Sequence, residues 1–154
     1  MWAAAAAESP PPPADGALAA LAGALRTPSP PHPAAPAVGA TSVTHFPVTE
    51  ADTAAAMGHP DPGVTVLGSP RIGLWFELAT SPLMPDPGGA VRHVGVGLVV
   101  HHLGLAETGE EVVVEARVMH TAGRAVVFVL EATVEGRCVA RGVHHRRILD
   151  GIGG

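Results

Sequence analysis

Three polar side chains, Ser69, Glu77 and His102, stand in otherwise apolar stretches of the sequence. A hydroxyl, a carboxylate and an imidazole are together the groups that activate an oxygen nucleophile against an acyl carbon. Each residue also has an ordinary structural explanation: a helix cap for Ser69, a core histidine for His102, and an exposed stripe or a dimer salt bridge for Glu77. The combination predicts acyl chemistry if the fold brings the three groups together.

Ser69 and Glu77 belong to one predicted helix. Glu77 lies in the apolar run LWFELA at residues 74–79, where an unpaired buried carboxylate is costly, so it must be paired, protonated or part of a site. We expect the Ser69 hydroxyl to cap the helix by accepting from a first-turn N–H, with Pro70 at the first helical position. Eight residues of helix separate the two backbones by about 12 Å. To act together, the two side chains need either His102 between them or a dimer interface.

The helix is predicted at residues 72–79 (IGLWFELA) and ends near Pro82. Because this segment is apolar nearly all round, we expect it to be buried. A first strand is predicted at residues 41–48, and a long connection carrying Pro60 and Pro62 joins it to the helix.

Four further strands are predicted from alternating apolar residues, at residues 92–102, 111–120, 124–135 and 137–149. Short turns between alternating strands indicate an antiparallel meander. The even-numbered apolar residues from Val94 to Val100 share one face, and His102 continues that face toward the core. A lone apolar helix beside a curled antiparallel sheet must be wrapped by that sheet. The sequence therefore predicts an α+β hot-dog fold, with the sheet around one buried central helix, and a homodimer formed across a sheet edge.

Residues 1–40 differ from the rest of the chain, since they consist mostly of Ala and Pro. Proline lacks the N–H that helices and sheet interiors use, so a disordered tail is predicted there. A short helix is predicted at residues 17–26, too short to be stable alone. Residues 41–150 form the predicted hot-dog domain, and residues 151–154 a flexible C-terminus.

The overall composition narrows the function. A net charge of −5 argues against nucleic-acid partners, and the apolar runs are shorter than the roughly 20 residues of a membrane span. The single cysteine, Cys138, forms neither an internal disulfide nor a zinc-binding pair. The histidine doublets at 101–102 and 144–145 diverge on a strand and lack acidic ligands at useful spacing. We expect a cytoplasmic protein without metal or cofactor.

Two stretches, VLGSPRIGLWFE at residues 66–77 and HLGLAETG at residues 102–109, resemble the fluoroacetyl-CoA thioesterase family of single hot-dog domains. A weaker match is GVHHR at residues 142–146, and the resemblance covers about residues 43–150. It implies that Ser69, Glu77 and His102 form the catalytic set, with serine in place of the family's threonine. It also implies that Glu77 and His102 activate Ser69 or a water molecule.

Further residues are expected to meet the substrate. Backbone N–H groups of Gly68 or Ser69 are expected to stabilise the oxyanion formed by attack on the thioester. Trp75 and Phe76 are bulky and are expected to narrow the acyl pocket. Arg146 lies in the arginine-rich last strand, and arginine suits the phosphate that coenzyme A or a carrier protein brings.

The predicted function is hydrolysis of an acyl-thioester, carried by coenzyme A or by an acyl-carrier protein, to free acid and thiol. The acyl group and the carrier stay open. One alternative is a hot-dog hydratase, although the aspartate–histidine signature of those enzymes is missing. The other is a non-catalytic module that binds acyl-CoA or only dimerises.

Overall fold

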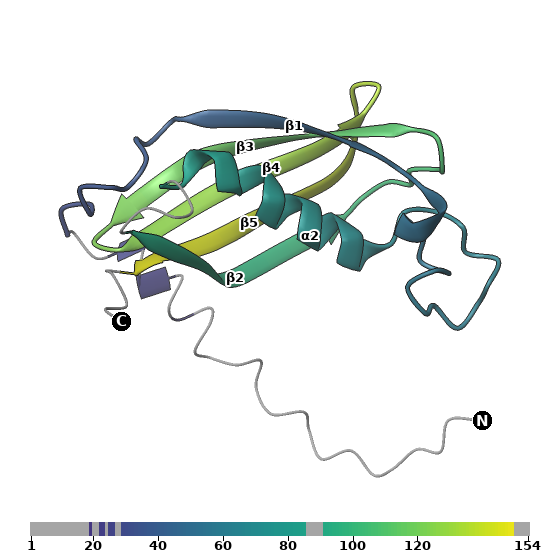
Figure 1. Ribbon diagram of the computed structural model, residues 1–154, viewed down its shortest axis with the longest axis horizontal. Coiled ribbons are helices and arrows are strands. Elements are labelled where there is room, and N and C mark those ends of the chain that lie inside the picture. Colours follow the sequence, from purple (N-terminus) through teal and green to yellow (C-terminus); the bar gives the residue numbers. More distant parts are fainter. Residues whose placement is uncertain (1–18, 20–21, 24, 27–28, 86–90, 150–154) are drawn as a thin grey trace, which may run out of the picture.

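The computed structural model describes residues 19, 22–23, 25–26, 29–85 and 91–149. Five antiparallel strands form one sheet in the order β1-β3-β4-β5-β2. The helix α2 lies over one face of this sheet, between its two edge strands (Figure 1). The elements are β1 (Thr41–Pro47), η1 (Glu50–Asp52), α2 (Ser69–Thr80), η2 (Ser81–Leu83), β2 (Arg92–His102), β3 (Glu111–Ala122), β4 (Ala125–Val134) and β5 (Arg137–Leu149). The predicted α+β arrangement is confirmed.

The neighbours of β2 differ from the predicted meander. Strands β3, β4 and β5 pair in sequence order, but β2 pairs with β5, and β1 takes the place beside β3. The segment between β2 and β3, residues 103–110, is too long for a tight hairpin and instead joins the two strands across the sheet. This exchange makes β1 and β2 the two edge strands.

The core lies between α2 and the inner face of the sheet. Trp75 of α2 stacks on Phe46 of β1 with ring centroids 4.9 Å apart, and Phe76 packs against Gly142 of β5, where a Cβ would lie 2.7 Å from the ring. The predicted inner faces of β3 and β4 are confirmed, since all of their members are buried: Val112, Val114, Ala116, Val118, Val126, Phe128, Leu130 and Ala132.

The helix is not buried on every side, contrary to the prediction. Leu74 and Leu78 are 42% and 46% exposed, and Glu77 between them is exposed as well. A single sheet covers only one side of a helix, so the opposite stripe of α2 is open. The predicted end of the helix is confirmed, because Pro82 lies in the short helix η2 that follows Thr80.

A β-bulge interrupts the predicted alternation of β2. The pairing of β2 with β5 shifts between Gly95 and Gly97, which leaves Val96 as an extra residue. Beyond the bulge the faces are exchanged, so Val94 is largely exposed rather than on the core face. Leu98 faces the helix, where its Cδ2 would lie 3.3 Å from a Cβ on Gly73.

Residues 29–40 pack against the sheet, so the predicted disordered tail is wrong for this part. Pro31 forms a parallel bridge with Gly123, and the His32 N–H donates to the Gly123 carbonyl at 2.7 Å. Ala35 and Ala40 contact the core. The described residues between 19 and 26 are helical, as expected, whereas residues 1–18 and 151–154 lie outside the described part. No helix of the described residues is long and apolar enough to cross a membrane.

Candidate active site

The first half of the candidate site lies at the N-terminal end of α2. The Oγ atom of Ser69 is 2.8 Å from Nδ1 of His102, at the end of β2. The prediction that Ser69 caps the helix is wrong, because the Gly68 carbonyl accepts the first helical bonds from Arg71 and Ile72, at 3.0 and 3.3 Å. Ser69 is therefore the first helical residue, and its hydroxyl is available to the histidine.

Gly68 has a structural role that removes it from the predicted oxyanion donors. Its N–H donates to the Asp52 carbonyl at 2.9 Å. A Cβ at this position would lie 3.0 Å from Met57 Sδ and 3.2 Å from Ala54 Cα, so the close approach of these segments requires glycine. The N–H of Ser69 remains as the predicted donor, since the first N–H groups of a helix have no acceptor within it.

An ion pair supports the same end of the helix. The Asp52 carboxylate lies 2.8 Å from Nε of Arg71 and accepts hydrogen bonds from both the N–H and the hydroxyl of Thr49, at 2.8 and 2.6 Å. Asp52 is buried, so these partners offset the cost of taking its charge out of water. The contacts fix the first turn of α2, and with it Ser69.

The second ring nitrogen of His102, Nε2, has no hydrogen-bond partner among the described residues. Nε2 is buried. A buried polar atom without a partner costs about 1–3 kcal/mol. This nitrogen therefore points to a missing partner, either substrate or another chain.

Glu77 lies at the opposite end of the helix. Its Oε1 would be 3.3 Å from a Cβ on Gly95, and Gly95 precedes His102 by seven residues of extended strand, or about 23 Å. Because α2 and β2 run antiparallel, the serine and the glutamate contact opposite ends of the strand. Within one chain, the expectation that His102 lies between Ser69 and Glu77 is wrong.

Arg146 lies behind Glu77 and is not available to a phosphate. Its side chain is only 4% exposed, and Nη1 donates to the carbonyl of Glu77 at 3.1 Å and to the hydroxyls of Thr80 and Ser81 at 2.9 and 3.2 Å. Burial lowers the pKa of Arg146, and the nearby Glu77 opposes that shift. The guanidinium stabilises the negative end of the helix dipole. The predicted role in phosphate recognition is wrong.

Two histidines complete this buried polar cluster. Nδ1 of His144 is 3.1 Å from the Thr80 hydroxyl, and Nδ1 of His93 is 2.9 Å from Nη2 of Arg146. Burial, followed by the charge of Arg146 and by His145, lowers the pKa of His144 to about 4, and the pKa of His93 is lowered by burial and then by Arg146. Both rings are therefore neutral at pH 7.

Sequence reasoning missed this cluster, although alternation along the last strand carries a signal for it. His144 and Arg146 share parity with Ile148, an apolar core residue. Two polar residues on a core face require partners, and the end of the predicted helix was the nearest source of them.

Trp75 and Phe76 belong to the core rather than to an acyl pocket. Both side chains are buried, and their rings pack against Phe46 and Gly142. They offer no surface to a substrate, so the predicted narrowing of the pocket is wrong in this conformation.

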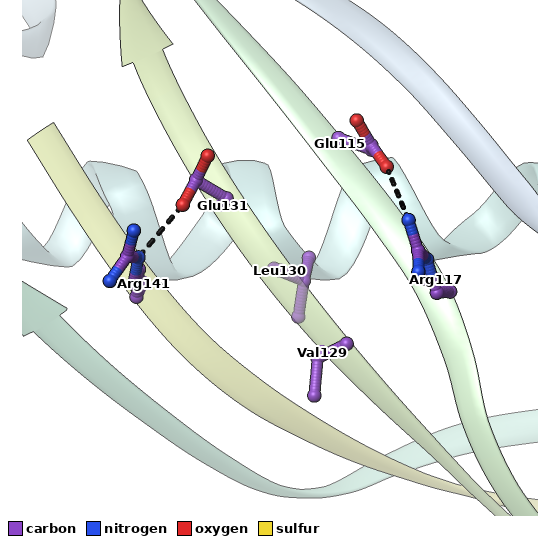
Figure 2. Close-up of a pocket in the computed structure, with 6 residues that line it drawn as sticks. All are labelled: Glu115, Arg117, Val129, Leu130, Glu131 and Arg141. Atoms are coloured by element: carbon purple, nitrogen blue, oxygen red, sulfur yellow. Dashed lines mark hydrogen bonds and ion pairs between the residues drawn. The ribbon is translucent and has the colours of Figure 1, made fainter. Parts of the chain in front are cut away.

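A separate hollow of about 400 Å³ lies on the outer face of the sheet. Figure 2 shows its two ion pairs, Glu115 with Arg117 at 3.4 Å and Glu131 with Arg141 at 2.8 Å. These charges neutralise each other at an exposed surface, where such pairs contribute little. Across the described residues no group of three or more His, Cys, Asp or Glu side chains is placed to hold a metal ion.

Comparison with models of protein families gives a match for this chain. Residues 48–151 match the model of FlK, the fluoroacetyl-CoA-specific thioesterase. The chain belongs to this family. The assignment confirms the predicted thioester hydrolase. No match was found among curated protein sequences.

Solved structures agree on the hot-dog fold. A hot-dog-like protein from Thermanaerovibrio acidaminovorans is 21% identical, with 73% of this chain and 83% of that chain covered and a TM-score of 0.66. A thioesterase superfamily member from Thermus thermophilus is 26% identical, with coverages of 74% and 84% and a TM-score of 0.66. A mutant of FlK in complex with fluoroacetate and CoA is 19% identical, with coverages of 74% and 95% and a TM-score of 0.64. The predicted hot-dog fold is confirmed.

Proposed function

We propose that this thioesterase hydrolyses acyl-thioesters at a site shared by two copies of the chain. The observation that carries the proposal is the Ser69–His102 pair. Nε2 of His102 is buried and has no hydrogen-bond partner among the described residues. Glu77, the third predicted catalytic residue, has an exposed carboxylate at the far end of the same helix. Each chain thus carries both halves of a site, at positions that do not meet.

A second copy of the chain accounts for an exposed apolar surface beside these residues. We name it the α2–β2 surface; its members, all 41–46% exposed, are Leu74, Leu78, Val96 and Leu98. Within the described residues β2 pairs only with β5, so its outer edge has free backbone groups. Unprotected edge strands invite pairing with another chain, and a clustered apolar surface favours burial. A symmetric dimer satisfies both needs.

The register of such a dimer follows from the positions of the two half-sites. If two copies of β2 pair antiparallel around Val99, and Val96 in the bulge is left without a partner, His102 of one copy lies opposite Gly95 of the other. Glu77 lies beside Gly95 in its own chain. The dimer therefore places the Ser69–His102 pair next to the partner's Glu77, and Nε2 of His102 gains a carboxylate acceptor.

This arrangement supports a two-step hydrolysis. The Ser69 hydroxyl donates to Nδ1 of His102, whose Nε2–H donates to the partner's Glu77. The Ser69 oxygen bonds to the acyl carbon, its proton passes to His102, and the C–S bond breaks as the thiolate takes that proton. A water molecule then bonds to the acyl carbon, and Glu77 takes one of its protons. The bond to Ser69 breaks as Nδ1 of His102 passes the second water proton to the serine oxygen, so the acid leaves as its carboxylate and Glu77 releases its proton to solvent.

The N-terminal end of α2 stabilises the charge that develops in both steps. The Ser69 N–H and the positive end of the helix dipole lie beside the reacting carbon and suit an oxyanion. A donor of this kind contributes about 10²–10³-fold in kcat. The substrate is an acyl group carried by coenzyme A or by a carrier protein, and specificity for fluoroacetyl-CoA is not part of the proposal.

Thiol release from a panel of short, branched and aryl acyl-CoAs tests this function. We expect turnover of at least one panel member and its collapse in Ser69→Ala, after each variant is shown to fold by circular dichroism. The same panel is then offered on a carrier protein. Absence of thiol release with both carriers would contradict the proposal.

A further inference from the structure

Two polar atoms from different elements converge over Gly95 in the bulge of β2. A Cβ on Gly95 would lie 2.8 Å from Nε2 of His144 and 3.3 Å from Oε1 of Glu77. The two atoms therefore lie on the same side of Gly95 and no more than about 6 Å apart, a separation that one water molecule can bridge with two hydrogen bonds. Because Gly95 has no side chain, no atom of its own stands between the two groups.

The hydrogen bonds of Thr80 determine which ring nitrogen of His144 carries the proton. Nη1 of Arg146 can only donate, so the Thr80 oxygen accepts from it at 2.9 Å. The one hydroxyl proton of Thr80 goes to the Glu77 carbonyl at 2.8 Å. The remaining contact, 3.1 Å to Nδ1 of His144, therefore requires a proton on Nδ1. Nε2 is then an acceptor and directs its lone pair toward Gly95.

Given the thioesterase mechanism proposed above, we propose that His144 is a positioning residue that holds the hydrolytic water over Gly95. The water donates one hydrogen bond to Nε2 of His144 and the other to the carboxylate of Glu77. With both protons engaged, a lone pair of the water oxygen is directed at the acyl carbon. During attack the proton facing Glu77 passes to that carboxylate, and the proton facing His144 stays on the oxygen.

The surroundings of His144 suit this role. Its side chain is 2% exposed, and its ring lies 6.5 Å from the ring of Phe128. Burial, followed by the charge of Arg146 and by His145, lowers the pKa of His144 and so disfavours its protonation. A neutral ring does not take the proton intended for Glu77. Since His144 acts through the water and through Glu77, it orients the reaction without replacing the base.

Two isosteric variants separate the roles of the two ring nitrogens. The amide of glutamine reaches the position of Nε2, whereas the amide of asparagine reaches only the position of Nδ1. We expect His144→Asn to lower kcat by about 10–100-fold, with KM changed by less than about threefold, and His144→Gln to restore most of kcat. If asparagine supports kcat as well as glutamine does, His144 contributes only its contact with Thr80, and the inference is overturned.

Two glycines of the same strand give an independent test without changing His144. In Gly95→Ala the new methyl stands between Nε2 of His144 and the Glu77 carboxylate and displaces the bridging water, and we expect kcat to fall by a similar factor. In the matched control Gly97→Ala, the new Cβ meets only His145 Cβ at an ordinary 3.8 Å, and we expect kcat within about twofold of wild type. Unfolding temperatures confirm that both variants fold.

Different outcomes would contradict the thioesterase function and the position of the hydrolytic water. Wild-type protein that releases no thiol from any substrate contradicts the thioesterase proposal itself. Wild-type activity that is lost in Ser69→Ala, but unchanged in both His144→Asn and Gly95→Ala, contradicts only the placement of the water.

Discussion

The two ends of α2 differ in how extensively their polar groups are hydrogen-bonded. At the N-terminal end, an exposed serine meets a half-buried histidine at 2.8 Å, and one histidine nitrogen is buried without a partner. At the C-terminal end, an exposed glutamate stands on a buried cluster of Arg146, Thr80 and His144, densely connected by hydrogen bonds. One end presents a serine whose histidine partner has an unpaired nitrogen, and the other presents a carboxylate beside a buried cluster whose members are joined by hydrogen bonds. In the dimer proposed above, the active site is complete only where the N-terminal end of α2 in one copy meets the C-terminal end of α2 in the other.

Substitution at the N-terminal end of α2 is expected to lower kcat the most. Ser69→Ala removes the nucleophile, and we expect kcat to fall by about 10³-fold or more, measured by thiol release. Ser69→Thr is the matched control, because it keeps the hydroxyl and restores the residue type of the family's catalytic set. If the alanine variant retains wild-type kcat, water attacks directly and the two-step mechanism is wrong.

The C-terminal end is expected to show loss of activity without loss of stability. Glu77→Gln keeps the shape of the side chain but removes the base, and we expect a fall in kcat of about 10²–10⁴-fold. Because Glu77 is exposed in the single chain and the glutamine oxygen can still accept from the partner's His102, the free energy of unfolding in urea should change by less than about 0.5 kcal/mol. A large loss of stability would instead assign Glu77 a structural role.

Separating the two copies should inactivate both ends at once. Leu78→Asp places a charge in the α2–β2 surface, and we expect a monomer by analytical ultracentrifugation, with kcat reduced by about 100-fold because the base is lost. The control is Val43→Asp, which places the same charge at the 57% exposed Val43 on the other edge strand. A dimer broken by the Val43 change and not by the Leu78 change would move the interface to β1.

The buried cluster should also make stability depend on pH. The pKa of His144 is about 4 in the folded chain, against 6.5 for an ordinary histidine. Between these values the unfolded chain binds a proton that the folded chain excludes. Stability is therefore retained above pH 6.5 and falls as the pH drops toward 4, by about 3 kcal/mol from this residue. Urea unfolding at several pH values should show a shallower fall for His144→Gln, and equal slopes would contradict the assignment.

Local patterns were sufficient to predict one half of the site. The alternation in β2 from Leu98 to His102 and the first turn of α2 each depend on neighbouring residues, so the sequence predicted His102 on the helix side. The pairing of Ser69 with His102 then followed from the fold, and the two residues do lie together.

Long-range features were not predictable in the same way. The pairing of β2 with β5, rather than with β3, depends on which strand edges remain free after the sheet forms. The extra residue Val96 exchanges the faces of β2; the flanking Gly95 and Gly97 are a local signal for a bulge, but they do not indicate which residue is left unpaired. Arg146 was assigned to phosphate because it lies in an arginine-rich strand and arginine suits phosphate, whereas the end of α2 provides the hydrogen bonds that allow it to be buried.

Complementation between two inactive variants tests the shared site most directly. Ser69→Ala and Glu77→Gln are mixed in equal amounts, unfolded and refolded together, so that about half of the dimers contain one copy of each. Each mixed dimer then has one intact site, with Ser69 from one copy and Glu77 from the other. We predict recovery of about a quarter of wild-type thiol release, since one site in four is intact. Activity no higher than that of either variant alone, in a mixture shown to contain mixed dimers, would contradict the shared site.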